Sequence, residues 1–556
     1  MEKLHKIFFG ILIIAVVVTG CDPLLDTNSD RQVLPANNQI NSPNDTIYSM
    51  VGLFNGLNKL ADRYVLLGEL RGELMDVSAK ADPDLKEIYN FDISQNNQYN
   101  KIDDYYSVIN NCNYLINNID TALVARAEKP LLKEYAAIKA IRAWTYMQLA
   151  LNYGKAKYYT EPVLTVEDAN KTYPEYDIYG LAEKLIPDLE PLQYVQQLSG
   201  FSLGEDLTSD QTYFPVKFVL GDLYLWSGRY EEAARVYHDL MVDRSLIISF
   251  FYRSTWTVDN GVFVSREWIN QDWNSIFNLG NNEQITLIAG STEYGEGSRL
   301  DSLTAYYNVL NPSQAAIDNW NKQTYYYNAN VFTEGDLRGD LGSYYGPVSS
   351  SVVQALYQEQ GMNININYNN EIIKYNYLTT STTKAVIVYR RGLLYLRYAE
   401  AVNRAGKPNL AFAVLKNGLS PETMMVDSIV PKDEKYSSFT DSTGTFYDYA
   451  DFGDVIFRNS IGVHERGCGD VHLANDYRIP ASGSLDDSIQ YVEDKIVEEL
   501  ALETAFEGNR FHDLMRVALR RHDPSYLANI VAEKYTVNKE AIRTKLMDEN
   551  NWYLKP

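Results

Sequence analysis

The stretch ELALETAFEGNRFHDLMR, residues 499–516, decides how the C-terminal part of the chain folds. Glu499, Glu503 and Glu507 recur at every fourth position, so a helix would place their carboxylates on one face. Like charges at this spacing repel one another. The three acids are therefore either an active site, or scaffold charges that are matched by Arg510, Arg516 and neighbouring basic residues.

The apolar residues of the same stretch favour a scaffold. A stripe that includes Val497 and Phe506 indicates one helix, Gly508 can end it, and Phe511 begins the next. The acids and bases would then form a partly buried network, in which removal of one partner costs about 3–5 kcal/mol. We expect Glu507→Ala to lower the folding yield, while any protein that does fold still binds its ligand.

The first residues of the chain resemble a lipoprotein signal. The apolar run 7–18 has roughly twelve residues, too few for a spanning helix, which needs about 20, but typical of a secretory signal over residues 1–20. It ends in VTGC, which resembles a bacterial lipobox with Cys21 as the acylated residue. A plain signal peptide followed by a chance cysteine is the alternative. Residues 21–48, rich in Asn, Asp and Pro, predict an extended lipidated tether.

Composition excludes some classes of protein. The chain has 556 residues, enough for more than one core, and 45% of them are hydrophobic. A formal charge of −23 argues against nucleic acid as a partner, because a phosphate backbone is bound by surplus Lys and Arg. Two cysteines beyond Cys21, at positions 112 and 468, are too few for a disulfide framework, although one bridge is possible.

Two segments have the spacing of tetratricopeptide units. LGDLYLWSGRYEEAARVYHDL (220–240) and LRYAEAVNRAGKPNLAFAVL (396–415) place small and aromatic residues where two helices approach closely. Each unit leaves an apolar face that another must cover, so further degenerate copies are expected around 50–150 and 175–195. Residues 49–244 are therefore predicted to be an N-terminal helical part.

Residues 245–556 form a second predicted part, in which helical repeats return at about 385–420 and 488–522. Between them, 245–385 and 420–490 are rich in Tyr, Asn, Gly and Ser, with short β-like runs such as EQITLIAG. Loops this long usually carry function. The predicted fold is mostly α: a tetratricopeptide-like helical-repeat scaffold that supports an irregular, loop-rich ligand-binding part with short β-strands.

Catalytic motifs are missing from the sequence. It contains no His-Glu-x-x-His helix, no Gly-x-Ser-x-Gly elbow and no phosphate-binding Gly loop. His464, Cys468 and His472 are four residues apart and could be a metal-binding face of a helix, but Gly467 and Gly469 favour a tight turn. We expect no enzyme, no metal site and no cofactor.

Tyrosine is unusually abundant, with 44 Tyr against 19 Phe. An aromatic face with a hydrogen-bonding tip suits polar ligands such as sugar rings. Trp144 and Trp226 lie in repeat helices and are expected in the core, and Trp552 is expected to anchor the C-terminus. The candidate ligand-binding aromatics of the loop-rich part are Trp256, Trp268, Trp273, Trp320, Tyr326, Tyr344 and Tyr345. Local loop packing is the alternative role of each.

Together these features resemble the SusD/RagB-like nutrient-binding lipoproteins of the Bacteroidetes outer membrane. The likeness runs from the lipobox through AAIKAIRAWTYMQLALNYG, YLWSGRYEEA, LLYLRYAEAVNRAG and GVHERGCGD to the terminal NWYLKP. Its most specific part is a Glu-Leu-x-Phe-Glu-Gly-x-Arg-x-x-Asp-Leu-x-Arg signature, from which the chain departs only at Leu500 and Thr504. The matching residues are Glu503, Phe506, Glu507, Gly508, Arg510, Asp513, Leu514 and Arg516.

The resemblance implies four tetratricopeptide-like units in a surface-exposed, lipid-anchored outer-membrane protein. Such a protein caps a SusC-like TonB-dependent transporter barrel and passes oligosaccharide to it without chemical change. In some relatives the cargo is peptide, which is one alternative; a pure tetratricopeptide adaptor for envelope proteins is another. Asp76, after the first helix, lies in a region that often contributes to the ligand site.

Overall fold

The computed structural model describes residues 43–124, 129, 131–197, 207–263, 270–292, 297–346, 370–376, 382–441 and 444–556. The signal segment 1–20, Cys21, most of the tether and Trp268 lie outside these residues. None of the described helices is both long enough and apolar enough to cross a membrane.

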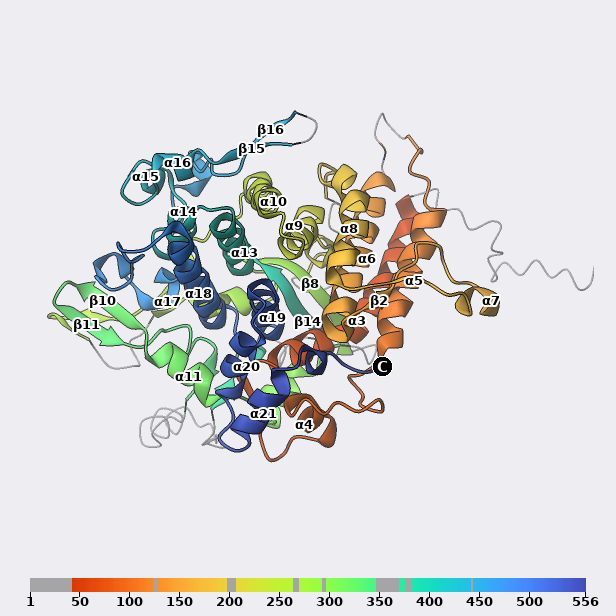
Figure 1. Ribbon diagram of the computed structural model, residues 1–556, viewed down its shortest axis with the longest axis horizontal. Helices are drawn as coiled ribbons and strands as arrows, with labels where there is room; N and C mark the ends of the chain where they lie inside the picture. Colours follow the sequence, from red (N-terminus) through yellow and green to blue (C-terminus); the bar gives the residue numbers. More distant parts are fainter. Residues whose placement is uncertain are drawn as a thin grey trace, which may run out of the picture.

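Helices dominate the first part of the chain (Figure 1). They are α3 (Pro43–Glu69), α4 (Pro83–Tyr89), α5 (Ile102–Asn118), α6 (Leu131–Tyr153), α7 (Val166–Ala169), α8 (Ile178–Leu189), α9 (Val216–Trp226) and α10 (Tyr230–Asp243). Helix α3 begins inside segment 21–48, which was expected to be an extended tether. Its first residue is Pro43, whose fixed φ suits the first position of a helix.

Helices return in the second part, separated by loops and short strands, as the sequence predicts. They are α11 (Gln314–Asn321), α13 (Arg391–Arg404), α14 (Pro408–Lys416), α15 (Pro421–Met424), α16 (Lys432–Lys435), α17 (Glu465–Cys468), α18 (Leu485–Glu503), α19 (Arg510–Arg521), α20 (Pro524–Ala532) and α21 (Lys539–Leu546). The mostly α fold class is confirmed.

The strands pair in twos, all antiparallel. The longest pair, β8 (Gln284–Ser291) with β14 (Thr383–Arg390), crosses the centre of the molecule and leads directly into α13 (Figure 1). The other pairs are β1 (Met75–Val77) with β9 (Leu310–Pro312), β2 (Ala156–Lys157) with β3 (Glu175–Tyr176), β4 (Ser254–Thr255) with β7 (Asn270–Gln271), β5 (Val258–Asp259) with β6 (Val262–Phe263), β10 (Thr324–Asn328) with β11 (Val331–Glu334), β12 (Tyr344–Tyr345) with β13 (Glu371–Ile372), and β15 (Ser438–Thr440) with β16 (Phe446–Asp448).

The two predicted tetratricopeptide units form helix pairs, α9–α10 and α13–α14. Gly221 on α9 shows why a small residue is needed, because a Cβ built there would lie 2.4 Å from the Tyr237 ring on α10. The aromatic ring fills the space that the glycine leaves, which lets the two helices approach closely, as the spacing predicts.

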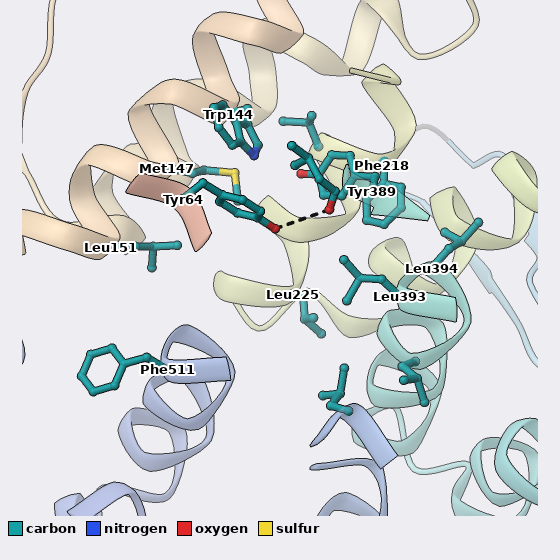
Figure 2. Close-up of a cluster of buried hydrophobic side chains, with 14 of the residues drawn as sticks. Tyr64, Trp144, Met147, Leu151, Phe218, Leu225, Tyr389, Leu393, Leu394 and Phe511 are labelled. Carbon is teal, nitrogen blue, oxygen red and sulfur yellow. Dashed lines mark hydrogen bonds between the residues drawn. The ribbon is translucent and has the colours of Figure 1, made fainter. Parts of the chain in front are cut away.

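One large hydrophobic core joins the two parts of the chain. Figure 2 shows Tyr64 from α3, with Trp144 and Met147 from α6, opposite Phe218 from α9 and Tyr389 from β14. The Phe218 and Tyr389 rings stack at 3.8 Å between centroids. Trp144, Trp226 and Trp552 are all buried, as expected.

The helix that carries the glutamate ladder is shorter than predicted. Helix α18 ends at Glu503, so Glu507 lies in the following turn and Gly508 does not end the helix. In this turn Phe506 and Gly508 both have positive φ, 70° and 93°. The turn takes this shape because its backbone N–H groups point at one carboxylate, that of Glu69 at the end of α3, which accepts from Phe506 (3.0 Å) and Gly508 (2.8 Å).

Candidate functional site

The three glutamates of the opening stretch lie in a buried ion-pair cluster. We call it the central ion-pair cluster; its acids are Glu283, Asp336, Glu499, Glu503 and Glu507, and its bases are Arg338, Lys374, Arg390, Arg466 and His464. All ten side chains are at least 92% buried. The bases come from β14, α17, the residue before α17 and loops, and all of them except Arg338, which is two residues from Asp336, are far in sequence from the acids that they bind.

Glu503 lies at the middle of this cluster. Its Oε1 accepts from Arg390 (2.7 Å) and from Arg466 (2.8 Å), and its Oε2 accepts from Arg338 (2.8 Å). Burial alone would raise the pKa of Glu503, but the charges of Arg466, Arg390 and Arg338 outweigh burial and hold that pKa well below its usual range. A carboxylate held permanently ionised and enclosed by guanidinium groups is not suited to exchange protons with a substrate.

The two neighbouring glutamates are matched in the same way. Glu507 binds Lys374 and Arg390, each at 2.6 Å, and Glu499 binds Arg338 at 2.6 Å. Among the described residues, Glu283 Oε2 and Arg466 Nη2 have no hydrogen-bond partner, although both side chains are ion-paired through other atoms. The cluster joins distant segments of the chain through buried ion pairs, and we call such a cluster a fold lock. It is not arranged as an active site, which agrees with the scaffold hypothesis.

The predicted partners of the ladder were wrong. Arg510 Nε donates to Glu73 on the α3 side (2.8 Å), and Arg516 binds Glu400 of α13 at 2.6 Å and Asp513 at 3.0 Å. Both arginines follow Glu507 closely in sequence, but α19 directs them to other helices. Both arginines therefore link α19 to other helices of the scaffold. Glu499, Glu503 and Glu507 pair instead with basic residues that are more distant in sequence.

The possible metal ligands come together only in part. His464 and Cys468 lie near Asp336, whereas the His472 ring nitrogen contacts Asn417. Residues 465–468 form one helical turn despite Gly467. The carboxylate of Asp336, however, already has partners. Asp336 binds Arg338 at 2.6 Å and accepts from Cys468 Sγ at 3.1 Å. A cation would have to replace that guanidinium. Cys112 and Cys468 are both buried free thiols.

Two of the candidate tryptophans belong to the core instead of a ligand site. Trp273 is fully buried in a second apolar cluster with Phe277 and Ile387. Trp320 is 1% exposed, and its Nε1 donates to the Leu502 carbonyl at 3.1 Å. Neither ring has an open face on which a sugar could stack. Local loop packing was the alternative role of these rings, and here they pack the loops onto the scaffold.

The other aromatic candidates are divided between two places. Trp256 and Tyr326 are partly exposed and lie among the hairpins β5–β6 and β10–β11, where Phe263 bridges Trp256 and Tyr325. Tyr344 is buried against Trp320, whereas Tyr345 is 43% exposed at the edge of the β12–β13 pair.

Next to that edge the surface is hollowed by a polar depression of about 450 Å³, within the range of ligand pockets. It lies where β1 pairs with β9, so that Asp76 is directly opposite Asn311. We call this hollow the β1–β9 depression; it is lined by Ser78, Ala79, Lys80, Asn308, Asn311, Pro312 and Asn370.

Segment 302–312, which supplies one side of the depression, has an unusual backbone. Residues 302–306 form a π-helical turn, and Asn308 follows with a φ of 47°. Short π-helical turns and left-handed non-glycine residues are concentrated at functional sites. The two features together make this segment a candidate functional segment.

Amide groups dominate the depression. With the Asn311 amide assigned in the orientation that satisfies its neighbours, Asn311 Nδ2 donates to the Asn370 carbonyl (3.0 Å) and to Asn308 Oδ1 (2.6 Å). Asn308 is 2% exposed, and its Nδ2 meets no hydrogen-bond partner among the described residues. An unpaired buried donor costs stability, so its presence at a hollow points to a bound acceptor. Such groups can hold a hydroxylated ligand.

Exposed tyrosines adjoin the depression. Tyr307 is 63% exposed, and its carbonyl accepts from Lys80 Nζ at 3.2 Å. Gly346, after Tyr345, lies close to Asn370, because a Cβ built on it would be 3.8 Å from Asn370 Oδ1. Asp76 and Tyr345, both candidates from the sequence, lie beside the depression, but the lining amides were not among the candidates. Only the clustering of Asn in YYNVLNPS, residues 306–313, could have indicated them.

A larger hollow, of about 770 Å³, lies on the helical part between α6, α9 and α10. Its polar side chains are largely matched to one another: Gln193 accepts from Arg235 at 2.6 Å, and Lys217 binds Asp243 at 2.6 Å. Its size alone would favour this hollow over the β1–β9 depression as the ligand site. Among its described lining residues, however, none has a left-handed backbone or a buried donor without a partner.

Comparisons with known proteins agree on the fold. No protein-family model matches the sequence, and the curated proteins give no match. The similar solved structures include a SusD superfamily protein from Bacteroides vulgatus, with a TM-score of 0.58 and 15% sequence identity over 92% of this chain and 95% of that one. They also include a laminarin-binding SusD-like protein, with a TM-score of 0.52 and 15% identity over 90% of this chain and 95% of that one. Surface glycan-binding protein A from Bacteroides fluxus has a TM-score of 0.52 and 15% identity over 90% of this chain and 94% of that one.

The chain thus has the SusD-like fold, a tetratricopeptide-like helical scaffold, as the sequence resemblance implied. At 15% identity the likeness concerns the fold, and function has to be argued from the site.

Proposed function

We propose that the chain is a non-catalytic nutrient-binding lipoprotein, which binds an oligosaccharide in the β1–β9 depression and delivers it to a SusC-like TonB-dependent transporter. The observation that carries this proposal is the depression itself, where amide groups and an unpaired buried donor lie beside exposed tyrosines. Amides recognise sugar hydroxyls, and tyrosine rings can stack on sugar C–H faces.

The likeness to solved structures supports the choice of ligand. Two of the three similar structures are described as a laminarin-binding protein and a surface glycan-binding protein. Attachment through Cys21 completes the proposal and rests on the lipobox, whereas the outer-membrane location and exposure at the cell surface rest on the family resemblance.

Binding can be tested by isothermal titration of the chain with a panel of oligosaccharides that differ in sugar, linkage and charge. We expect at least one ligand with a dissociation constant below the millimolar range, and a loss of affinity in the Asn311→Ala variant. Absence of binding to every member at millimolar concentration would contradict the proposal. Binding of peptides in place of sugars would favour the alternative cargo.

Delivery to a transporter needs a separate test. Affinity capture from solubilised outer membranes of the native host should recover a large β-barrel protein with the chain. Recovery of the barrel from a Cys21→Ser strain would show that the contact is independent of the lipid anchor. Capture of soluble envelope proteins without a barrel would favour the adaptor alternative.

A further inference from the structure

The β1–β9 depression has a consistent charge and hydrogen-bonding character. Lys80 is the only charged residue among the described residues that line it, and no lining residue there is a carboxylate. This is unusual on a chain with a net charge of −23. Charges farther away than a Debye length, about 8 Å at physiological ionic strength, are largely screened, so the local lysine outweighs the overall negative charge.

The turn after β1 holds Lys80 in place. The Lys80 backbone N–H donates to Ser78 Oγ at 3.2 Å, and the Ala81 N–H donates to the Ser78 carbonyl at 3.1 Å. The Lys80 ammonium donates one hydrogen bond to the Tyr307 carbonyl, at 3.2 Å. An ammonium group has three donors, so two are left without a partner among the described residues.

The second available donor is Asn308 Nδ2. Its own carbonyl oxygen is taken by Asn311, at 2.6 Å, which fixes the direction of the amide and leaves the NH₂ group without a partner among the described residues. Lys80 Nζ and Asn308 Nδ2 are therefore two hydrogen-bond donors of the depression that remain available to a ligand. An anionic group with several acceptor oxygens satisfies such donors better than a hydroxyl does.

Two nearby carboxylates do not cancel this character. Asp76 Oδ1 accepts from the Val77 N–H at 2.7 Å, and the Asp76 charge interacts with buried Lys534. Glu371 follows Asn370 but is not among the lining residues, and burial raises the pKa of its carboxyl group.

From this geometry we infer that the ligand is an acidic oligosaccharide, whose carboxylate or sulfate group is received by Lys80 and Asn308 at the floor of the depression. The inference rests on the proposed function and specifies its ligand class. Exposed Tyr307, beside the two donors, is placed to stack on the sugar ring that carries the acid.

Matched pairs of oligosaccharides test this inference by isothermal titration. Each acidic member, such as an oligogalacturonate, an oligoalginate or a chondroitin sulfate fragment, is compared with its carboxyl-reduced or desulfated form. We expect the bound glycan to lose at least tenfold in affinity when its acid is removed, and the affinity of the acidic form to fall with added salt.

Two variants locate the acid group. Lys80→Gln should weaken binding of the acidic form about tenfold and leave the affinity for its neutralised form unchanged, while Lys80→Arg retains binding. Asn308→Asp keeps the shape and tolerates the left-handed backbone, but places a carboxylate where the donor was, so acid binding should fall at least tenfold. Lys171→Gln is the control, because Lys171 is an exposed lysine just after α7 whose ammonium binds Asp168 at 2.6 Å.

The outcomes separate this inference from the proposed function. Tight binding of neutral members alone, insensitive to Lys80→Gln, would overturn the acidic-ligand inference and leave the binding function in place. Absence of binding to both forms of every pair, and to the neutral panel, would overturn both.

Discussion

The central ion-pair cluster and the β1–β9 depression are both rich in polar side chains, yet they differ in how these groups are matched. In the cluster each acid meets a base, and the side chains are shut off from solvent. In the depression the Lys80 ammonium and the Asn308 amide have hydrogen-bond donors without a partner among the described residues. Matched charges hold a fold together, whereas donors left without a partner beside a hollow make the depression the candidate ligand site. The predictions below test each half of that contrast.

The largest expected effect is the loss of Glu503. Glu503→Ala would leave Arg338, Arg390 and Arg466 without their shared partner, and should lower the free energy of unfolding by about 3–5 kcal/mol, measured by chemical denaturation. The control is Glu498→Ala on the same helix, which removes a partly exposed partner of Lys322 and Lys495 and should cost under about 1 kcal/mol. Equal effects of the two changes would show that the cluster is not a fold lock.

The next-largest expected loss of stability comes from disturbing the contact between α3 and the turn at 506–508. A Cβ on Gly68 would lie 1.9 Å from the Gly508 carbonyl oxygen, so Gly68→Ala should lower stability by about 3 kcal/mol, the upper end for overpacking. Gly52→Ala on the same helix meets nothing within 4 Å and should raise stability slightly. A tolerated Gly68→Ala would mean that α3 can move away from the turn.

Lys534, buried between the cluster and the depression, makes stability depend on pH. It donates to the Leu70 carbonyl at 2.6 Å, and burial lowers its pKa to about 7. The unfolded chain keeps this proton up to a pH of about 10.4 and the folded chain releases it near 7, so the unfolded state binds more protons in between and stability should rise with pH.

Between pH 7 and 9 this contribution should be about 2 kcal/mol. It is measured as the difference between the wild type and Lys534→Met, because other groups titrate in both proteins. Lys539→Met, on exposed α21, is the control and should leave the pH dependence unchanged. Parallel curves for wild type and Lys534→Met would contradict the assignment.

The smallest effect concerns the depression. Tyr307→Ala should weaken oligosaccharide binding by about 1 kcal/mol through lost stacking, and change stability by less than about 0.5 kcal/mol because the side chain is 63% exposed. Tyr436→Ala, at a tyrosine that is 72% exposed and does not line the depression, should change neither quantity. Binding that responds to Tyr436 instead would move the site elsewhere.

The helical scaffold was predictable from sequence because its signals are local. Apolar periodicity placed the helices, and Gly221 with Tyr237 predicted a close helix pair that the structure confirms. The ladder of acids was equally visible, but its partners were not. Arg338, Arg390 and Arg466 lie far from Glu503 in sequence, and only the tertiary fold brings them to it.

The site was predictable only as a neighbourhood. The resemblance directed attention to Asp76, and the structure places the depression where the strand of Asp76 pairs with that of Asn311. That pairing joins segments distant in the chain, so the sequence shows only a local cluster of Asn at 306–313 and gives no sign that Lys80 lies beside it. Tryptophan in a loop gives no sign of whether it faces solvent or core, which is why Trp273 and Trp320 misled.

One measurement tests the central claim most directly. The best oligosaccharide of the panel is titrated into the Tyr307→Ala/Asn311→Ala double variant, and the unfolding midpoint of the same protein is recorded. The account predicts an affinity at least thirtyfold below that of the wild type with an unfolding midpoint within about 2 °C of it. Unchanged affinity in this variant would contradict the claim that the β1–β9 depression is the ligand site.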